Sequence, residues 1–159
     1  MGTFDLLIVG QVLFLLTMAN GVPVLGKRLF GRKMTAPLDC GLILNDGQPL
    51  FGKSKTIRGA VLAIIVTTMF SPLIGLEFLI GALVSAAAMI GDLFSSFVKR
   101  RLKMPSSSKA TGLDQIPEAL LPALLARCLL PLTLFDISAI VFLFFIGNSF
   151  FRSCLRDEG

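Results

Sequence analysis

Long apolar stretches dominate the chain and predict helices that cross a membrane. A helix needs about 20 mostly apolar residues to span the hydrocarbon core of a bilayer. Five stretches approach this length, at residues 4–25, 58–76, 78–98, 116–134 and 136–151. The short connections at 71–75 and 131–136 would make antiparallel pairs of the second and third stretches and of the fourth and fifth. The pattern therefore predicts an all-α integral membrane protein with five transmembrane helices, forming a single domain over residues 1–159.

Composition agrees with this class, because 54% of the 159 residues are apolar and only 16% are charged. A soluble domain carries about 45–50% apolar and about 25% charged residues. A disordered chain is excluded on the same grounds. A secretory signal peptide is a rival interpretation of the first stretch, but it needs a basic start, and residues 1–3 carry no Lys or Arg. We therefore expect the first stretch to be a membrane-spanning helix of the mature protein and not a cleaved signal.

The positive charges predict how the chain is oriented in the membrane. All fifteen Lys and Arg residues except Arg127 lie in or beside the loops 26–57 and 99–115 or in the C-terminal tail. In a chain with five spans these segments share one side, which the positive-inside rule makes cytoplasmic. We therefore expect a multi-pass protein of the cell membrane, with the N-terminus outside and the C-terminus cytoplasmic. Its active site would lie on the cytoplasmic side.

Three acidic residues near the predicted cytoplasmic boundary suggest a metal site. Asp92 lies inside the third stretch, where a carboxylate is costly and usually functional. Asp114 and Glu118 are four residues apart at the start of the fourth. Carboxylate oxygens without His or Cys nearby favour Mg²⁺. The alternatives are an ion pair of Asp92 with Arg127 or with a snorkelling Lys, and helix capping by the other two acids.

Polar residues accompany Asp92 along one face of its predicted helix. Helical spacing places Ser85, Ser95, Ser96 and Lys99 on that face. This stripe would extend from the cytoplasm into the membrane and could meet the headgroup of a lipid.

The end of the first loop suggests an anion site. Residues 51–59 read Phe-Gly-Lys-Ser-Lys-Thr-Ile-Arg-Gly and directly precede a predicted helix. Backbone N–H groups at a helix N-terminus, together with Lys and Arg, attract phosphate. The spacing is not that of a Walker A loop. A topology signal or contact with lipid headgroups is the alternative interpretation of these charges.

A metal site, a phosphate loop and a polar stripe at one membrane face are the parts that phosphoryl or nucleotidyl transfer requires. A lipid phosphate would be one substrate. A small transporter or channel, and a structural membrane subunit, are alternatives from other classes. The basic loops lack interleaved aromatic residues, so we expect no nucleic acid as a partner.

Three short motifs resemble one enzyme superfamily. Residues 91–100, Gly-Asp-Leu-Phe-Ser-Ser-Phe-Val-Lys-Arg, resemble the G-D-x-x-x-S-x-x-K-R signature of CDP-diglyceride synthases, the phosphatidate cytidylyltransferases. Residues 55–59 resemble the K-T-x-x-G loop of that superfamily, and residues 112–116 its later acidic motif. The resemblance covers roughly residues 40–125 and is greatest to the archaeal branch, CDP-archaeol synthase. Pro117 stands where the bacterial pattern has an acid, which argues against the bacterial branch.

The resemblance implies a reaction and a role for each candidate residue. CTP and an unsaturated archaeal ether-lipid phosphate, 2,3-di-O-geranylgeranylglyceryl phosphate, would give CDP-archaeol and pyrophosphate with Mg²⁺. A phosphatidate cytidylyltransferase that makes CDP-diacylglycerol is the nearest alternative. The implied catalytic residues are Asp92, Lys99 and Asp114, and the implied metal ligands are Asp92, Asp114 and Glu118. Lys53, Ser54, Lys55, Thr56 and Arg58 would bind the nucleotide phosphates; Ser95, Ser96 and Arg100 the lipid phosphate or pyrophosphate; and Asn45 and Asp46 the base or ribose.

Overall fold

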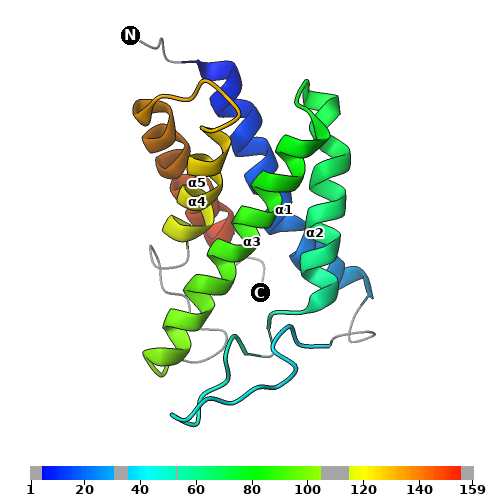
Figure 1. Ribbon diagram of the computed structural model, residues 1–159, viewed down its shortest axis with the longest axis vertical. Helices are drawn as coiled ribbons and strands as arrows, with labels where there is room; N and C mark the ends of the chain where they lie inside the picture. Colours follow the sequence, from blue (N-terminus) through cyan, green and yellow to red (C-terminus); the bar gives the residue numbers. More distant parts are fainter. Residues whose placement is uncertain (1–4, 31–35, 53, 105–114, 155–159) are drawn as a thin grey trace.

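The structure, a computed structural model, describes residues 5–30, 36–52, 54–104 and 115–154. Within these ranges the chain is helical, apart from its loops and two isolated β-bridges in the segment 36–56. The elements are α1 (Leu6–Phe30), α2 (Ile57–Phe70), the short 3₁₀ helix η1 (Ser71–Ile74), α3 (Phe78–Arg101), α4 (Gln115–Ala126) and α5 (Leu134–Cys154). They form one bundle (Figure 1), and the prediction of an all-α protein is confirmed.

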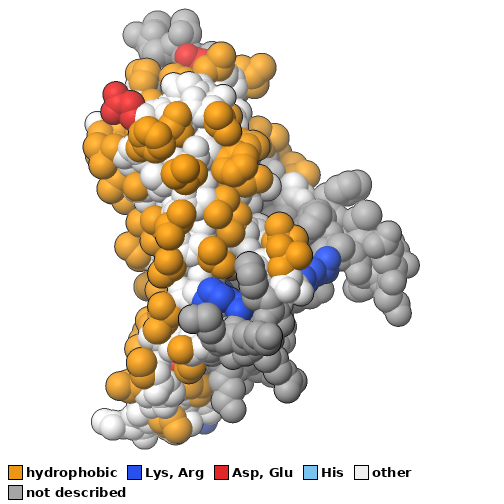
Figure 2. Space-filling model, turned by 90° about the vertical axis from the view of Figure 1, so that its right-hand side faces the viewer, with side chains coloured by type: hydrophobic (Ala, Val, Ile, Leu, Met, Phe, Trp, Pro, Cys, Tyr) orange, Lys and Arg blue, Asp and Glu red, His pale blue; other side chains and the backbone are white. Residues whose placement is uncertain are grey.

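Three helical segments are long and apolar enough to cross a membrane, namely Leu6–Leu29, Ile57–Ile74 and Phe78–Arg101. Two further apolar helical segments, Gln115–Ala126 of α4 and Leu134–Ser149 of α5, are shorter. Large apolar side chains remain exposed along the bundle, among them Leu7, Ile65, Leu79 and Phe142. Figure 2 shows such side chains spread over one face of the molecule, while the visible Lys and Arg side chains lie in its lower half. This distribution suits a surface that faces lipid.

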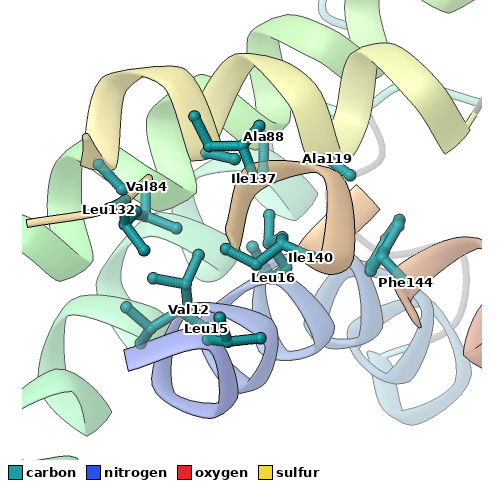
Figure 3. Close-up of a cluster of buried hydrophobic side chains, with 14 of the residues drawn as sticks. Val12, Leu15, Leu16, Val84, Ala88, Ala119, Leu132, Ile137, Ile140 and Phe144 are labelled. Carbon is teal, nitrogen blue, oxygen red and sulfur yellow. The ribbon is translucent and has the colours of Figure 1, made fainter. Parts of the chain in front are cut away.

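The core lies where α1, α3, α4 and α5 meet. Its α1 side is built from Val12, Leu15 and Leu16, which face Val84 of α3 and Ile140 of α5 (Figure 3). Small residues of α4 complete the cluster and allow a close helix–helix approach, as in other membrane bundles: Ala119, Ala123 and Ala126. Helix α2 packs outside this cluster against α1 and α3. The bundle thus holds α3 between α2 on one side and α4 on the other.

The turn between the second and third predicted helices is confirmed. Helix α2 ends at Phe70 and continues into η1, which has Pro72 in its first turn. Gly75 then adopts a left-handed conformation with φ 81°, which glycine accepts without steric cost.

Most helix ends lie a few residues from the predicted ones, and the ends of α1 and α4 show why. Helix α1 extends to Phe30, five residues beyond the predicted end, because its last turn carries Lys27 and Arg28, which suit the negative end of the helix dipole. Helix α4 ends at Ala126, whereas the prediction extended it to residue 134. Residues 127–133, which include Arg127 and Pro131, form a connection instead, and Pro131 disfavours helical backbone at the residue before it.

The end of α4 changes the interpretation of two charged residues. Arg127, which the prediction placed inside the fourth stretch, is exposed directly after α4, at the end of the bundle away from the basic loop. Asp136 lies in the first turn of α5 and not in the preceding connection. Its carboxylate accepts hydrogen bonds from the N–H and the hydroxyl of Thr133, at 2.8 and 2.7 Å, and so caps the helix.

Candidate functional site

A loop with its own internal hydrogen bonds precedes α2 and covers one end of the bundle (Figure 1). Within residues 36–56 the chain turns back on itself, with bridges between Pro37 and Thr56 and between Ile43 and Pro49. We call this segment the basic-end loop, because it lies beside the Lys- and Arg-rich ends of the helices. Its two bridges bring the start of the loop next to the residues that open α2.

The central contact of the site joins this loop to α3. The ammonium group of Lys55 donates to both carboxylate oxygens of Asp92. The two side chains are 23% and 21% exposed, so the ion pair is largely but not wholly shielded from solvent. Two residues that are 37 positions apart in the sequence thus meet at the end of the bundle. Of the partners predicted as alternatives for Asp92, Arg127 or a snorkelling Lys, the structure thus shows a lysine, Lys55.

The remaining residues of the predicted phosphate loop lie around the start of α2. Thr56 is the N-cap residue, and its hydroxyl accepts a hydrogen bond from the N–H of Gly59 at 3.2 Å. Arg58 lies half-buried in the first turn, and Ser54 is exposed in the turn before it. Lys53 lies outside the described residues. The arrangement places cations and a helix N-terminus together, which is the chemistry of an anion site.

The polar stripe predicted on α3 is buried, as expected for residues that face the bundle. Ser85, Ser95 and Ser96 are each at most 2% exposed, and Lys99 and Arg100 are 8% and 3% exposed. The hydroxyls of Ser95 and Ser96 both donate to the backbone carbonyl of Asp92, at 2.9 and 2.8 Å. In this structure their protons are thus used within the helix, and their lone pairs stay available as acceptors.

Helices α3 and α4 touch backbone to backbone beside Asp92. A Cβ atom at Gly91 would lie 2.3 Å from the carbonyl oxygen of Pro117 and 2.9 Å from the Cα of Glu118. Only glycine fits at this crossing. At this crossing Gly91, the residue before Asp92, lies against the backbone of Glu118. Glu118 carries a second carboxyl group and is buried, with 5% of the residue exposed.

The third predicted acid, Asp114, lies outside the described residues, directly before α4. Among the residues that the structure describes, no three His, Cys, Asp or Glu side chains form a group able to hold a metal ion. The predicted Mg²⁺ site of Asp92, Asp114 and Glu118 thus depends on the undescribed Asp114. Its donor set is nevertheless the hard oxygen set that Mg²⁺ prefers, and both oxygens of Asp92 already hold a cationic group, the Lys55 ammonium.

Asp46 ties the basic-end loop to α3. Arg101 pairs with its carboxylate and also donates to the carbonyl oxygen of Pro49, at 3.0 Å. The pKa of Asp46 lies below its usual value, mainly because its carboxylate accepts a hydrogen bond from the N–H of Gln48. The hydrogen bond and positive charge of Arg101 lower the pKa further. Asp46 therefore acts as a loop anchor in this structure, while Asn45 beside it is exposed. Their predicted contact with the base or ribose stays a prediction.

Sequence reasoning missed Asp39, a buried acid at the start of the basic-end loop. Its carboxylate accepts hydrogen bonds from the N–H groups of Gly41, Phe51 and Gly52, at 3.1, 3.0 and 3.0 Å. Burial acts to raise the pKa of Asp39, but these hydrogen bonds outweigh it and lower the pKa below its usual value. The available signal was an Asp two residues before a Gly, a pattern that favours an Asx turn.

Arg101 was missed as well. It lies in the last turn of α3, one residue after the motif, and its guanidinium stacks 5.2 Å from the ring centroid of Phe97. The sequence showed only one more cation in a basic segment.

Comparisons with known proteins give consistent results. A family model described as "CarS-like: CDP-archaeol synthase" matches residues 4–151. A CDP-archaeol synthase of Pyrobaculum arsenaticum is 39% identical over 116 residues, covering 70% of this chain and 68% of that protein. A CDP-archaeol synthase of Saccharolobus islandicus is 37% identical over 124 residues, covering 75% and 72%.

A solved structure has the same arrangement of helices. It is described as an intramembrane enzyme for the biosynthesis of archaeal membrane lipids. The two chains superimpose with a TM-score of 0.68 at 25% sequence identity, over 87% of this chain and 90% of the other.

Proposed function

This chain belongs to the CDP-archaeol synthase family, and on that premise we propose that it transfers CMP from CTP to 2,3-di-O-geranylgeranylglyceryl phosphate. The family makes the chain a membrane-embedded cytidylyltransferase that uses CTP. The products of the proposed reaction are CDP-archaeol with unsaturated chains and pyrophosphate. The identity of the lipid acceptor and the need for Mg²⁺ are the parts of this proposal that go beyond family membership.

The contact between Lys55 and Asp92 is the observation that best supports the proposed site. It joins the K-T-x-x-G loop and the G-D-x-x-x-S-x-x-K-R helix, the two motifs that carry the resemblance. A cation that can bind phosphate and a carboxylate that can bind a metal ion thus meet within the polar stripe of α3. An apolar bundle surface beside them suits the isoprenoid chains of the acceptor.

The reaction needs little acid–base chemistry from the protein. A phosphate oxygen of the lipid attacks the α-phosphorus of CTP, and a new oxygen–phosphorus bond forms. The bond from the α-phosphorus to the bridging oxygen of the β-phosphate breaks, and pyrophosphate leaves. Because the attacking oxygen is already anionic, no general base is required, which suits a chain without histidine.

The cationic residues would do most of the binding. Lys55 and Arg58, with the start of α2, would hold the phosphates of CTP. Lys99 and Arg100 lie about two helical turns beyond Asp92, roughly 10 Å along the axis, and would hold the lipid phosphate or the pyrophosphate. Positive charge on both sides of the reacting phosphorus stabilises the charge that develops in the transition state.

Asp92, with Asp114 and Glu118, would hold Mg²⁺. When bound there, the ion would neutralise charge on the phosphate oxygens. Together with the positive-inside rule, the basic residues at this end of the bundle support a site on the cytoplasmic side of the cell membrane.

A transfer assay with purified protein tests this proposal. The protein in detergent receives radiolabelled CTP with either the ether-lipid phosphate or phosphatidate, and labelled lipid and pyrophosphate are measured with Mg²⁺ or with EDTA. We expect label in the lipid with the ether acceptor, in amounts equal to the pyrophosphate released, and none with EDTA.

Each other outcome contradicts a separate part of the proposal. A preference for phosphatidate would assign the chain to ester lipids. Full transfer with EDTA would remove the metal from the reaction. Solute flux into proteoliposomes without nucleotide, in the absence of any transfer, would instead favour a transporter. Reactions without a lipid acceptor correct for CTP hydrolysis.

A further inference from the structure

The carboxylate of Asp39 is the centre of the basic-end loop. It is bound by three backbone N–H groups from two separate parts of the loop, the turn at Gly41 and the pair Phe51 and Gly52. The residue is only 8% exposed. A carboxylate that accepts several backbone N–H bonds makes strong, charge-assisted contacts. Asp39 therefore closes the loop by joining segments that are 12 and 13 residues apart.

The neighbours of this carboxylate hold the backbone of Lys55 from both sides. The N–H of Leu38 donates to the carbonyl oxygen of Lys55 at 2.8 Å, and the N–H of Lys55 donates to the carbonyl oxygen of Gly52 at 3.2 Å. Leu38 precedes Asp39 in the chain, and Gly52 is one of its hydrogen-bond partners. The two residues that hold the Lys55 backbone are thus the chain neighbour of Asp39 and one of its hydrogen-bond partners.

We propose that Asp39 is a positioning residue for nucleotide binding, which acts by fixing the backbone of Lys55 so that its ammonium group reaches the phosphates of CTP beside Asp92. This inference rests on the proposed function. Lys55 has a long, flexible side chain, and fixing its backbone lowers the entropy that is lost when the ammonium group binds a phosphate. In the described part of the chain, the hydrogen-bond partners of the Asp39 carboxylate all lie in the basic-end loop, and none belongs to α3.

The first test is Asp39→Asn. One carboxylate oxygen becomes an amide group, so at least one backbone N–H loses its acceptor and the negative charge disappears. We expect the KM for CTP and the dissociation constant for CTP, measured by calorimetry in detergent, to rise about tenfold, as for the loss of one charge-assisted hydrogen bond. We expect kcat and the KM for the lipid acceptor to change less than about threefold, because the reacting groups are all present.

Gly41→Ala tests the same contact with a milder change. Gly41 has φ +79°, a conformation that alanine adopts only with strain, and no atom lies within 4 Å of its added methyl group. The strain would displace the Gly41 N–H, which donates a hydrogen bond to the Asp39 carboxylate. We expect the KM for CTP to rise in the same direction as in Asp39→Asn but by a smaller factor, and this variant carries the test if the first does not fold.

Gly75→Ala is the matched control. Gly75 has φ +81°, and the nearest atom to the added methyl group is Nε2 of Gln11, at an ordinary contact distance of 3.6 Å. The backbone strain is therefore similar, but it falls in the turn between η1 and α3, away from the basic-end loop. Asp5→Asn controls for an acid-to-amide change, since Asp5 only caps the far end of α1. Both controls should bind CTP like the unaltered protein.

The outcomes separate this inference from the proposed function. Unchanged CTP affinity in Asp39→Asn, in a protein that transfers CMP, would overturn the inference alone. A fall in both kcat and the melting temperature with an unchanged KM for CTP would show that Asp39 has only a structural role, and this result would also overturn the inference. Absence of CMP transfer by the unaltered protein would instead contradict the proposed function, while the calorimetric comparison would still decide whether Asp39 positions Lys55.

Discussion

Asp92→Asn should abolish CMP transfer, with a fall in kcat of at least about 10²–10³, the range found when one group that stabilises a transition state electrostatically is removed. Asparagine keeps the size of the side chain but removes the negative charge. The charge holds the ammonium of Lys55 in place and would also bind Mg²⁺. Initial rates with labelled CTP measure the effect, and size-exclusion chromatography in detergent verifies that the variant is folded.

Glu77→Gln is the matched control on the same helix. Glu77 precedes the first residue of α3, is exposed and makes no capping hydrogen bond with its side chain. It lies at the opposite end of the helix from Asp92. The control should transfer CMP at the normal rate. Normal turnover by Asp92→Asn would remove this carboxylate from the mechanism and, with it, the metal site proposed here.

Gly91→Ala should be among the most destabilising substitutions in the bundle. The added methyl group would meet the backbone of α4, 2.3 Å from the oxygen and 2.6 Å from the carbonyl carbon of Pro117. Backbone atoms cannot rotate away as a side chain can, so α3 and α4 must separate. Overpacking typically costs about 1–3 kcal/mol and occasionally more, and we expect the upper part of this range or beyond. Thermal unfolding in detergent measures the loss of stability.

Two other helical glycines make sensitive controls for Gly91→Ala. A methyl group at Gly10 of α1 or Gly147 of α5 would meet no atom within 4 Å. At such positions alanine is favoured over glycine in a helix by up to about 1 kcal/mol. Gly10→Ala and Gly147→Ala should therefore be neutral or slightly stabilising. A melting temperature for Gly91→Ala equal to theirs would contradict the close crossing of α3 and α4.

Hydropathy alone predicted the helices well, because each must bury or expose a long apolar surface. It failed where apolar residues have another role. Residues 128–132 are apolar, yet they belong to the connection after α4, where Pro131 does not favour a continuous helix. The turn at Gly75, by contrast, was predictable from the Pro and Gly that frame it.

The candidate site was predictable in its residue types but not in its contacts. Asp92 and Lys55 each carried a local signal, a carboxylate in an apolar helix and a lysine before a helix N-terminus. Their ion pair depends on how α2 packs against α3, which no local pattern contains. Asp39 was missed for a different reason. The nearby Gly41 gave a local signal for an Asx turn, but the bonds to Phe51 and Gly52 use backbone N–H groups, which every residue except proline carries, so the sequence does not reveal these partners.

The contact at Gly91 also matters for the two acids beside it. Backbone meets backbone there, so no flexible side chain lies between α3 and α4 that could yield and let them drift apart at this level. The backbone positions of Asp92 and Glu118, the residues that carry the two carboxyl groups, are therefore held at a fixed spacing by the helices themselves.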